Sequence, residues 1–376
     1  MPPGGAPTII LLDAANTPET PDQKYARAQM MKWVLDQYRP GDRVAVFALT
    51  SRLVALSDFT DDPKVLLSVL RQYVAQTPLG TGTPAAPDVP APISGAAGAS
   101  LVALTQQLAD FHWGEVQFVN NRRADATVEA MRSLIRILGG IPGRKNIIWL
   151  TAGFPFSLVP QVQGFESSGS RWTDAELRGS GASGFSTGMN GGMERLYADK
   201  VRDIAARFAS SQIAIYPIDV TGLQTTAAGT EFDRQETMKE IARETGGQAF
   251  VNQNDLNRGA ELAFADQAAS YTIGYYPEDR KWDGNYRKVS VKVDHEGIEL
   301  RHRRGYYAFD PAGEKEKKFE QDLSDAVQDR ISSTQIAFDA RVSAVDKAKT
   351  RVEFVVDGSS LSVEDSGQGK HLNVNF

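Results

Sequence analysis

Uninterrupted runs of apolar residues divide the chain and predict the strands of a buried sheet. Four such runs occupy 9–12, 44–49, 147–150 and 213–218. A strand that is apolar at nearly every position is covered on both faces, which is typical of parallel sheets packed between helices. A shorter run, 53–56, follows the second run after a brief turn, so we expect it to pair as a hairpin at the edge of the sheet.

Stretches with helical spacing alternate with these runs. We expect a short strand over 248–251 and helices over 25–38, from Pro63 onward, and over 101–111, 126–138, 194–208, 232–244 and 255–267. This alternation predicts a doubly wound, mostly parallel, Rossmann-like α/β sheet with helices on both faces. The first strand leads into Asp-Ala-Ala-Asn-Thr instead of a glycine-rich turn, which argues against dinucleotide binding.

Two stretches rich in small residues interrupt the alternation. Residues 77–100 combine Pro, Gly, Ala and Thr, which predicts a flexible surface insertion, with a binding loop as the alternative. Residues 156–192 are rich in Gly and Ser and predict an excursion over the carboxyl edge of the sheet. That stretch lacks the Gly-Lys-Ser/Thr of a phosphate loop, so we do not expect it to bind phosphate.

Beyond residue 270 the pattern changes from α/β to β. Strand-like segments at 270–277, 287–293 and 298–304 predict a β extension, and two more at 335–342 and 351–356 predict a second, all-β unit. The expected organisation is a linker over 1–7, an α/β domain over 8–310 with its extension at about 270–310, a charged helical connector over 311–332 and a partial β-rich domain over 333–376. We expect this last unit to be truncated, because an unfinished sheet leaves an open apolar edge.

Composition excludes several classes of function. The net charge of -6 argues against nucleic acid as a partner, since phosphate binding needs a basic face. The absence of cysteine removes disulfides, thiol nucleophiles and thiolate metal sites. No apolar run approaches the roughly 20 residues of a membrane helix. None of the four histidines stands near a Gly-x-Ser-x-Gly elbow, so no sequence feature indicates nucleophilic catalysis.

Asp13 is the first polar residue after the first buried strand. Parallel strands end at a common edge, and open α/β sheets bind their ligands there. The sequence therefore predicts a ligand-binding surface around Asp13, without naming a reaction.

Several motifs together resemble a von Willebrand factor A (VWA) domain. They are the strand that ends in Asp13-x-Ala15-x-Thr17, the threonine-containing helix start 125–131, and the segment 142–155. Further matches occur at 215–223, 244–250 and 271–277. The set looks most like the VWFA-related branch of Acidobacteria and neighbouring bacteria. This resemblance implies a non-catalytic protein-interaction, adhesion or scaffold module with a protein partner, located in the cell envelope or secreted.

The resemblance also implies a metal-ion-dependent adhesion site. In that site an aspartate, hydroxyl groups and a second aspartate hold Mg²⁺ or Mn²⁺, and an open position accepts a carboxylate of the partner. Asp13 matches the first aspartate, Thr17 the second hydroxyl of the first motif, and Thr127 the threonine of a later loop.

Two positions depart from that pattern. Ala15 stands where the family has a serine, and Ala152 stands where it has an aspartate. The loss of a hydroxyl and a carboxylate predicts weak or absent metal binding, unless Asn16 or Asp219 compensates. With or without metal, we expect Asn16, Gly153 and Asp219 to contribute to the partner-binding edge.

Structural roles are the alternatives for each of these residues. Asp13 and Asp219 could cap the turns after their strands, and Thr17 and Thr127 could cap helices or turns. For the whole chain, the alternatives are a hydrolase-like enzyme with carboxylate chemistry at the same edge and a purely structural VWA domain without metal.

Overall fold

A computed structural model describes most of the α/β region and short parts of the C-terminal region. The described residues are 7–17, 20–39, 41–75, 96–141, 143–154, 197, 200–223, 229–268, 271, 273–275, 281–283, 285–294, 300, 302–303, 305–308, 338–344, 350–356, 364–365 and 370–371. The predicted linker apart from Pro7, the Gly/Ser stretch 156–192 and the helical connector 311–332 therefore lie outside the described residues.

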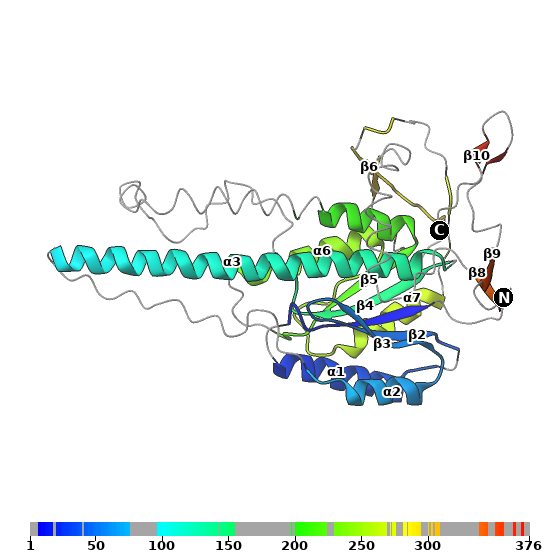
Figure 1. Ribbon diagram of the computed structural model, residues 1–376, viewed down its shortest axis with the longest axis horizontal. Coiled ribbons are helices and arrows are strands. Elements are labelled where there is room, and N and C mark those ends of the chain that lie inside the picture. The colour runs from blue at the N-terminus through cyan, green and yellow to red at the C-terminus, as the bar shows by residue number, and fades with distance from the viewer. Residues whose placement is uncertain are drawn as a thin grey trace.

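A five-stranded sheet forms the centre of the molecule. Four parallel strands, β1 (Thr8–Asp13), β2 (Val44–Leu49), β4 (Lys145–Thr151) and β5 (Ile213–Asp219), are joined at one edge by the antiparallel β3 (Leu53–Thr60). The strand order is β3-β2-β1-β4-β5, so β1 lies in the middle of the sheet (Figure 1). The doubly wound, mostly parallel fold and the edge hairpin predicted from the sequence are confirmed.

Helices cover both faces of this sheet and create two hydrophobic cores. Alternate residues of β1 point to opposite faces: Ile9 and Leu11 belong to one core, and Ile10 and Leu12 to the other. The helical residues 200–210 and the helices α3 (Ala96–Gly139) and α6 (Gly229–Thr245) supply the first core. The helices α1 (Thr20–Asp36), α2 (Pro63–Gln72) and α7 (Asn257–Ala268) supply the second.

The helix α3 corrects the sequence-based prediction. The two separate helices expected over 101–111 and 126–138 form one helix of 44 residues, which also takes in 96–100, the end of the predicted insertion. At 1.5 Å per residue α3 is about 66 Å long, and its N-terminal half projects beyond the sheet (Figure 1). Polar residues between the two apolar stretches obscured this continuity, because a helix outside the core needs no apolar stripe.

The last predicted strand of the sheet is also reduced. Residues 248–251 form only an isolated parallel bridge, between Phe250 and Ile218 of β5.

Among the described helices, none is long and apolar enough to cross a membrane.

In the described part of the predicted β extension, the strands are shorter than predicted. Of the expected β extension, the described part contains only β6 (Tyr286–Lys288) paired with β7 (Gly305–Tyr307), and 289–294 is not in a strand despite its alternating pattern. Farther on, β8 (Phe338–Ala344) pairs with β9 (Thr350–Val356), and β10 (Glu364–Asp365) pairs with β11 (Lys370–His371). Alternation alone overestimated strand length, because a strand also needs a partner for its backbone groups.

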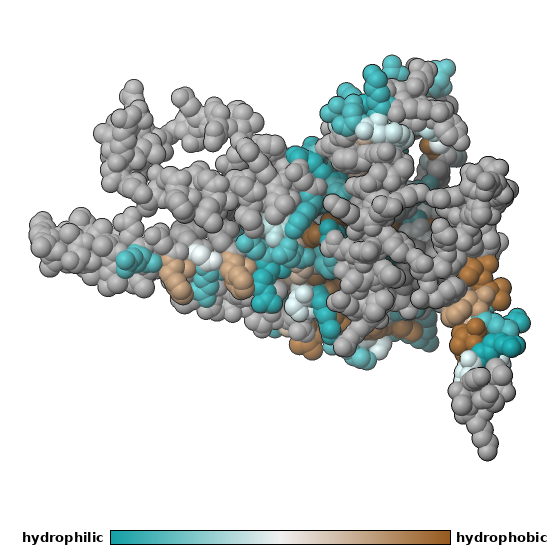
Figure 2. Space-filling view, turned by 45° about the horizontal axis from the view of Figure 1, so that its top comes forward, coloured by the Kyte–Doolittle hydropathy of each residue, from teal (hydrophilic) through white to brown (hydrophobic). Residues whose placement is uncertain are grey.

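The pair β8–β9 leaves apolar side chains exposed on its surface. Val342, Val352, Phe354 and Val355 are between 45% and 69% exposed, and brown apolar surface lies beside teal polar surface at the right of Figure 2, where Figure 1 places these strands. Two strands alone cannot bury an apolar face. The boundaries of this unit stay a prediction.

Replacing Gly114 tests the continuity of α3. Gly114→Ala is expected to raise the helical signal in far-UV circular dichroism and to slow amide exchange around residue 114. Alanine is favoured over glycine inside a helix by about 1 kcal/mol, and an added Cβ at Gly114 meets nothing within 4 Å.

Gly143→Ala is the matched control for this test. An added Cβ at Gly143 also meets nothing within 4 Å, but its φ is +84°, so alanine should lower the free energy of unfolding by about 1 kcal/mol. An unchanged helical signal in Gly114→Ala would contradict a continuous helix through this position.

Candidate functional site

The candidate site is built around Asp13 at the carboxyl end of β1. Its side chain is only 3% exposed. Leu11 of β1 pairs with Trp149 of β4, and both belong to the core under α3 and α6. The period of two along each strand therefore brings Asp13, Trp149 and Thr151 to the same face of the sheet.

Four donors satisfy the carboxylate of Asp13. The backbone N–H of Asn16 donates to Oδ1 at 3.0 Å. The side-chain amide of Asn16, the indole N–H of Trp149 and the hydroxyl of Thr151 all donate to Oδ2, at 2.9, 2.9 and 2.8 Å. A carboxylate buried among apolar residues needs such donors, because an unpaired buried charge is costly.

Asn16 links Asp13 to the helix α3. Its Nδ2 donates to Asp13 Oδ2 and also to Oγ1 of Thr127, at 2.8 Å. The Thr127 hydroxyl donates in turn to the carbonyl of Arg123, one turn earlier in α3, at 2.8 Å. Thr127 thus lies in the interior of α3, so it is neither a helix cap nor part of a helix start as the sequence suggested.

Gly153 occupies the loop after β4 and is joined to Asp13 through Thr151. Its N–H donates to Thr151 Oγ1 at 3.1 Å. Gly153 has a φ of +111°, and a Cβ built on it would lie 2.8 Å from the Cβ of Arg234 in α6. Only glycine fits here, for both backbone conformation and space. The contact fixes α6 against the loop after β4.

Asp219 at the end of β5 belongs to a separate cluster. Its Oδ1 accepts from the N–H and the hydroxyl of Thr221, at 3.0 and 2.6 Å, and its Oδ2 accepts from Gln235 at 3.2 Å. Gln235 also exchanges two hydrogen bonds with Asn252. Asp219 therefore has the turn-capping bonds that the alternative interpretation predicted.

Thr17 lies on the other side of Asp13. It is buried, and its backbone carbonyl accepts from Gln23 at 3.0 Å. With Asp13, Gln23 and Tyr73 it lines a small cavity of about 10 Å³, which has room for one water molecule. Of the three predicted metal ligands, Asp13 and Thr127 are joined through Asn16, and no contact between Thr17 and Thr127 is recorded.

Burial governs the electrostatics of the site. It raises the pKa of Asp13 above its ordinary value, and the hydrogen bonds from Asn16, Thr151 and Trp149 partly oppose that rise. Burial lowers the pKa of Arg123, the like charge of Arg234 lowers it further, and the charge of Asp13 acts in the opposite direction. Burial is therefore the largest influence on the pKa of both Asp13 and Arg123.

A divalent cation does not fit this arrangement of residues. Mg²⁺ needs about six oxygen ligands, whereas three N–H groups and one O–H group already point at the Asp13 carboxylate. The amide nitrogen of Asn16 stands between Asp13 and Thr127, the two oxygens that a metal would bridge. Asn16 Oδ1 is the one buried oxygen of the cluster without a partner among the described residues. No group of three described His, Cys, Asp or Glu side chains could hold a metal.

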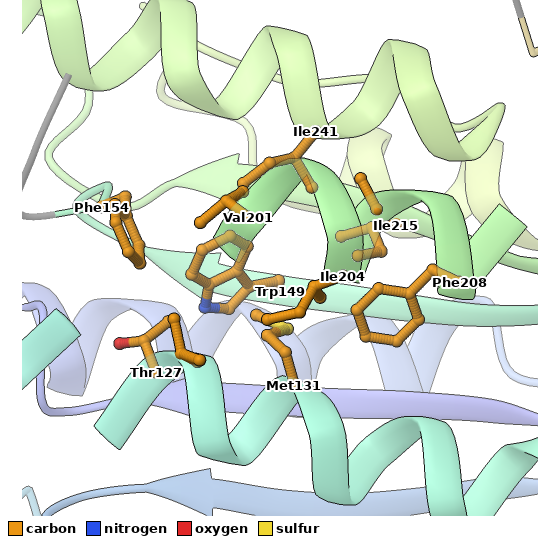
Figure 3. A pocket seen from close by; sticks show the side chains of 11 residues that line it. Thr127, Met131, Trp149, Phe154, Val201, Ile204, Phe208, Ile215 and Ile241 are labelled. Carbon is orange, nitrogen blue, oxygen red and sulfur yellow. The ribbon is translucent and has the colours of Figure 1, made fainter. Parts of the chain in front are cut away.

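An apolar cavity adjoins this network on the side of α3. Trp149, whose indole N–H bonds to Asp13, lines it, and so does Thr127 (Figure 3). The other lining residues are apolar, and they come from α3, the loop after β4, residues 201–208, β5 and α6. The cavity holds only about 20 Å³. The hydroxyl of Thr127 and the indole N–H of Trp149 are already hydrogen-bonded within the network, so we assign no ligand to it.

The sequence located the polar edge but missed half of the network. Asp13 was predicted from its position at a strand end, and Asn16, Thr127 and Gly153 from the VWA resemblance. The four are joined in the structure, directly or through Thr151. Trp149, Thr151, Arg123 and Arg234 were missed. Strand periodicity could have found the first two, whereas the arginines depend on how α3 and α6 dock on the sheet.

Comparison with known proteins finds similarity only among solved structures. No protein-family model and no curated protein matches the chain. An aerotolerance-related membrane protein of Bacteroides fragilis has 12% identity and a TM-score of 0.34, over 70% of this chain and 100% of that chain. Proximal thread matrix protein 1 of the mussel byssus, whose MIDAS motif is occupied by zinc, has 12% identity and a TM-score of 0.34, over 69% and 46%.

A von Willebrand factor type A structure from Catenulispora acidiphila has 13% identity and a TM-score of 0.32, over 70% of this chain and 43% of that chain. The solved structures similar to the chain thus include structures of the VWA type. At such low identity and TM-score they carry no argument about ligands or partners, which rests below on the geometry of the site.

A pair of Thr→Val variants tests the network around Asp13. Thr151→Val removes a donor from Asp13 and the acceptor of the Gly153 N–H. It should therefore lower the free energy of unfolding by about 1–3 kcal/mol, as measured by urea denaturation. Thr8→Val is the control, because Thr8 is equally buried but its hydroxyl has no partner among the described residues. It should be neutral or stabilising, and equal losses in the two variants would contradict the network.

The raised pKa of Asp13 predicts a dependence of stability on pH. Its ordinary value is 3.8, and the folded-state value is higher, so the folded state binds the proton more tightly than the unfolded state. The stabilisation is present below the unfolded pKa and is lost as pH rises through the folded pKa. In urea denaturation between acidic and neutral pH, the wild type should lose stability relative to Asp13→Asn, which cannot titrate. A wild type that gains stability relative to Asp13→Asn as pH rises would show the opposite shift.

Proposed function

We propose that this chain is a non-catalytic protein-interaction module that binds a protein partner at the carboxyl edge of its sheet. The observation that carries the proposal is the buried polar network at that edge, in which Asp13 joins the segment after β1, the end of β4 and, through Asn16, the helix α3. A core needs no such group, because polar side chains of this kind add desolvation cost. In open α/β sheets, ligands bind outside the carboxyl ends of the strands.

The proposal includes no catalytic step. The residues that donate to Asp13 are Asn16, Trp149 and Thr151, which offer neither a histidine base nor a second carboxylate. The second nearby carboxylate, Asp219, is held by Thr221 and Gln235. A binding role uses these groups as they stand, whereas a hydrolase would need a positioned base or acid beside them.

The projecting half of α3 supports a binding role. Thr127 lies where α3 meets the sheet, and the helix continues toward its N-terminus beyond the sheet (Figure 1). Phe111 and Phe118 in this projecting half are 76% and 61% exposed. A partner docked at the carboxyl edge would lie beside this part of the helix. The VWA resemblance further implies a location outside the cytoplasm, which we adopt as part of the proposal.

Capture of partners from the envelope fraction of the source organism, by cross-linking and mass spectrometry, tests this function. Leu223 follows β5 at the carboxyl edge and is 60% exposed, so Leu223→Lys should disturb binding without disturbing the fold. We expect it to reduce capture of the partner about tenfold or more, as loss of a central contact does.

Ser210→Lys is the matched control. Ser210 is exposed and precedes β5, so it lies at the opposite edge of the sheet and gains the same charge. It should capture the same partner as the wild type. Identical capture by the wild type and both variants would show that the carboxyl edge does not bind the partner. Turnover of a substrate at this edge would show that the protein is an enzyme and not a binding module.

A further inference from the structure

A cavity of about 490 Å³ lies between the end of α6 and the β extension. One wall comes from the last turn of α6 and the residues after it, namely Arg243, Gly246 and Gly247. The other wall comes from the β extension, namely Lys288, Val289, Ser290, Leu300 and His302. This volume is in the range of small-molecule sites, about 300–1,000 Å³. The two cavities near Asp13 hold only about 10 and 20 Å³.

This cavity lies toward the amino edge of the sheet, away from the proposed partner surface. A Cβ built on Gly247 would overlap the carbonyl oxygen of Ile215, near the start of β5. Asp219 at the carboxyl edge is four residues farther along the same strand, about 13 Å at the rise of a parallel strand. A ligand in the cavity would therefore be separate from a partner bound at the carboxyl edge.

Recorded contacts hold the two walls against each other. The carbonyl of Gly246 accepts a hydrogen bond from the guanidinium of Arg144 at 2.8 Å, which fixes the turn after α6. A Cβ built on Gly246 would lie 3.5 Å from the backbone nitrogen of Arg303. The hydroxyl of Tyr286 in β6 donates to Oε1 of Glu244 at 3.4 Å. The cavity is thus bounded by segments that touch beside it.

The charged side chains that line the cavity are basic. Arg243, Lys288 and His302 line it, and no Asp or Glu is among the described residues that do so. Arg243 pairs with Glu240, one turn earlier in α6, so its charge is partly neutralised. Lys288 is exposed and has no ion pair among the described residues. An anion in the cavity would give this ammonium group a partner.

Apolar side chains also line the cavity. Val289 is half-buried, and Leu300 is 40% exposed. Covering them with an apolar group would remove that surface from water, which is favourable. A water molecule takes up about 30 Å³, so a water-sized ion would fill little of the space. The walls therefore suit a larger ligand with an anionic end and an apolar body.

We propose that this cavity binds an organic anion that carries a carboxylate or a phosphate on an apolar body. The guanidinium of Arg243 and the ammonium of Lys288 bind the anionic group, since both anions offer oxygens to such donors. Val289 and Leu300 contact the apolar body. This binding site is additional to the proposed partner surface and does not depend on it.

Isothermal titration calorimetry of the whole chain at low salt tests the proposal. Naphthoate and naphthyl phosphate combine an apolar body with the two kinds of anion. Naphthamide keeps the apolar body without charge, whereas acetate and inorganic phosphate keep the charge without the apolar body. The wild type should bind naphthoate or naphthyl phosphate about tenfold or more tightly than the other three probes.

Lys288→Gln and Arg243→Gln should each weaken this binding about threefold or more, as loss of a partly exposed ion pair does. Lys292→Gln is the matched control, because Lys292 is exposed in the same segment as Lys288 but does not line the cavity. It removes the same charge and should change affinity by less than about 1.5-fold, as a screened surface charge does. Circular dichroism melts establish that each variant is folded.

A variant that fills the cavity tests the position of the site. Ser290 is exposed and lines the cavity, so Ser290→Trp should abolish binding without a change of charge. Any of four outcomes would overturn the inference: no binding of either anion by the wild type, equal binding of naphthamide, equal losses in Lys288→Gln and Lys292→Gln, or full binding by Ser290→Trp. Leu223→Lys, at the other edge, should bind the anions as the wild type does, so this site and the partner surface are tested independently.

Discussion

The hydrogen bonds to the buried carboxylate of Asp13 hold the carboxyl edge of the sheet in one arrangement. The donors come from the turn after β1 and from β4, and Asn16 extends the network to α3. Removing the Asp13 carboxylate would take this acceptor from the buried donors of Asn16, Trp149 and Thr151, and each buried donor left without a partner costs about 1–3 kcal/mol. The turn, the strand and the helix are therefore fixed relative to one another by polar contacts, while the apolar cores hold the rest of the sheet.

The donors around Asp13 also oppose the binding of a cation at this edge. Ala15 and Ala152, which follow β1 and β4, offer no side-chain oxygen. The side-chain amide of Asn16 places an N–H donor between Asp13 and Thr127, where a cation would need oxygen ligands. The alanines supply no oxygen ligand, and Asn16 adds a donor, so both features disfavour a cation.

The fold could be predicted where strands are buried on both faces, because such strands are apolar at nearly every position. Every central strand is an apolar run, and β3 was recognised as the edge hairpin by its position after β2. The predictions failed where burial is partial. The helix α3 continues through a stretch without a core-facing pattern, and 289–294 alternates like a strand but has no partner among the described residues. Within the site, a single sequence identifies residues at strand ends. It does not tell which helices pack beside them, and so it does not identify Arg123 of α3 or Arg234 of α6.

The two halves of α3 have different sources of stability, and this difference bears on how the edge works. Its C-terminal half is packed in the core through residues such as Leu134 and Leu138. Its N-terminal half projects from the sheet, whereas most helical stability in proteins comes from tertiary packing. The packed half supplies the nucleus from which the projecting half extends. Since Thr127 and Arg123 lie at the junction, the Asp13 network fixes the direction in which the helix leaves the molecule. A partner bound at the edge and beside the helix would therefore meet one rigid surface, not two independent ones.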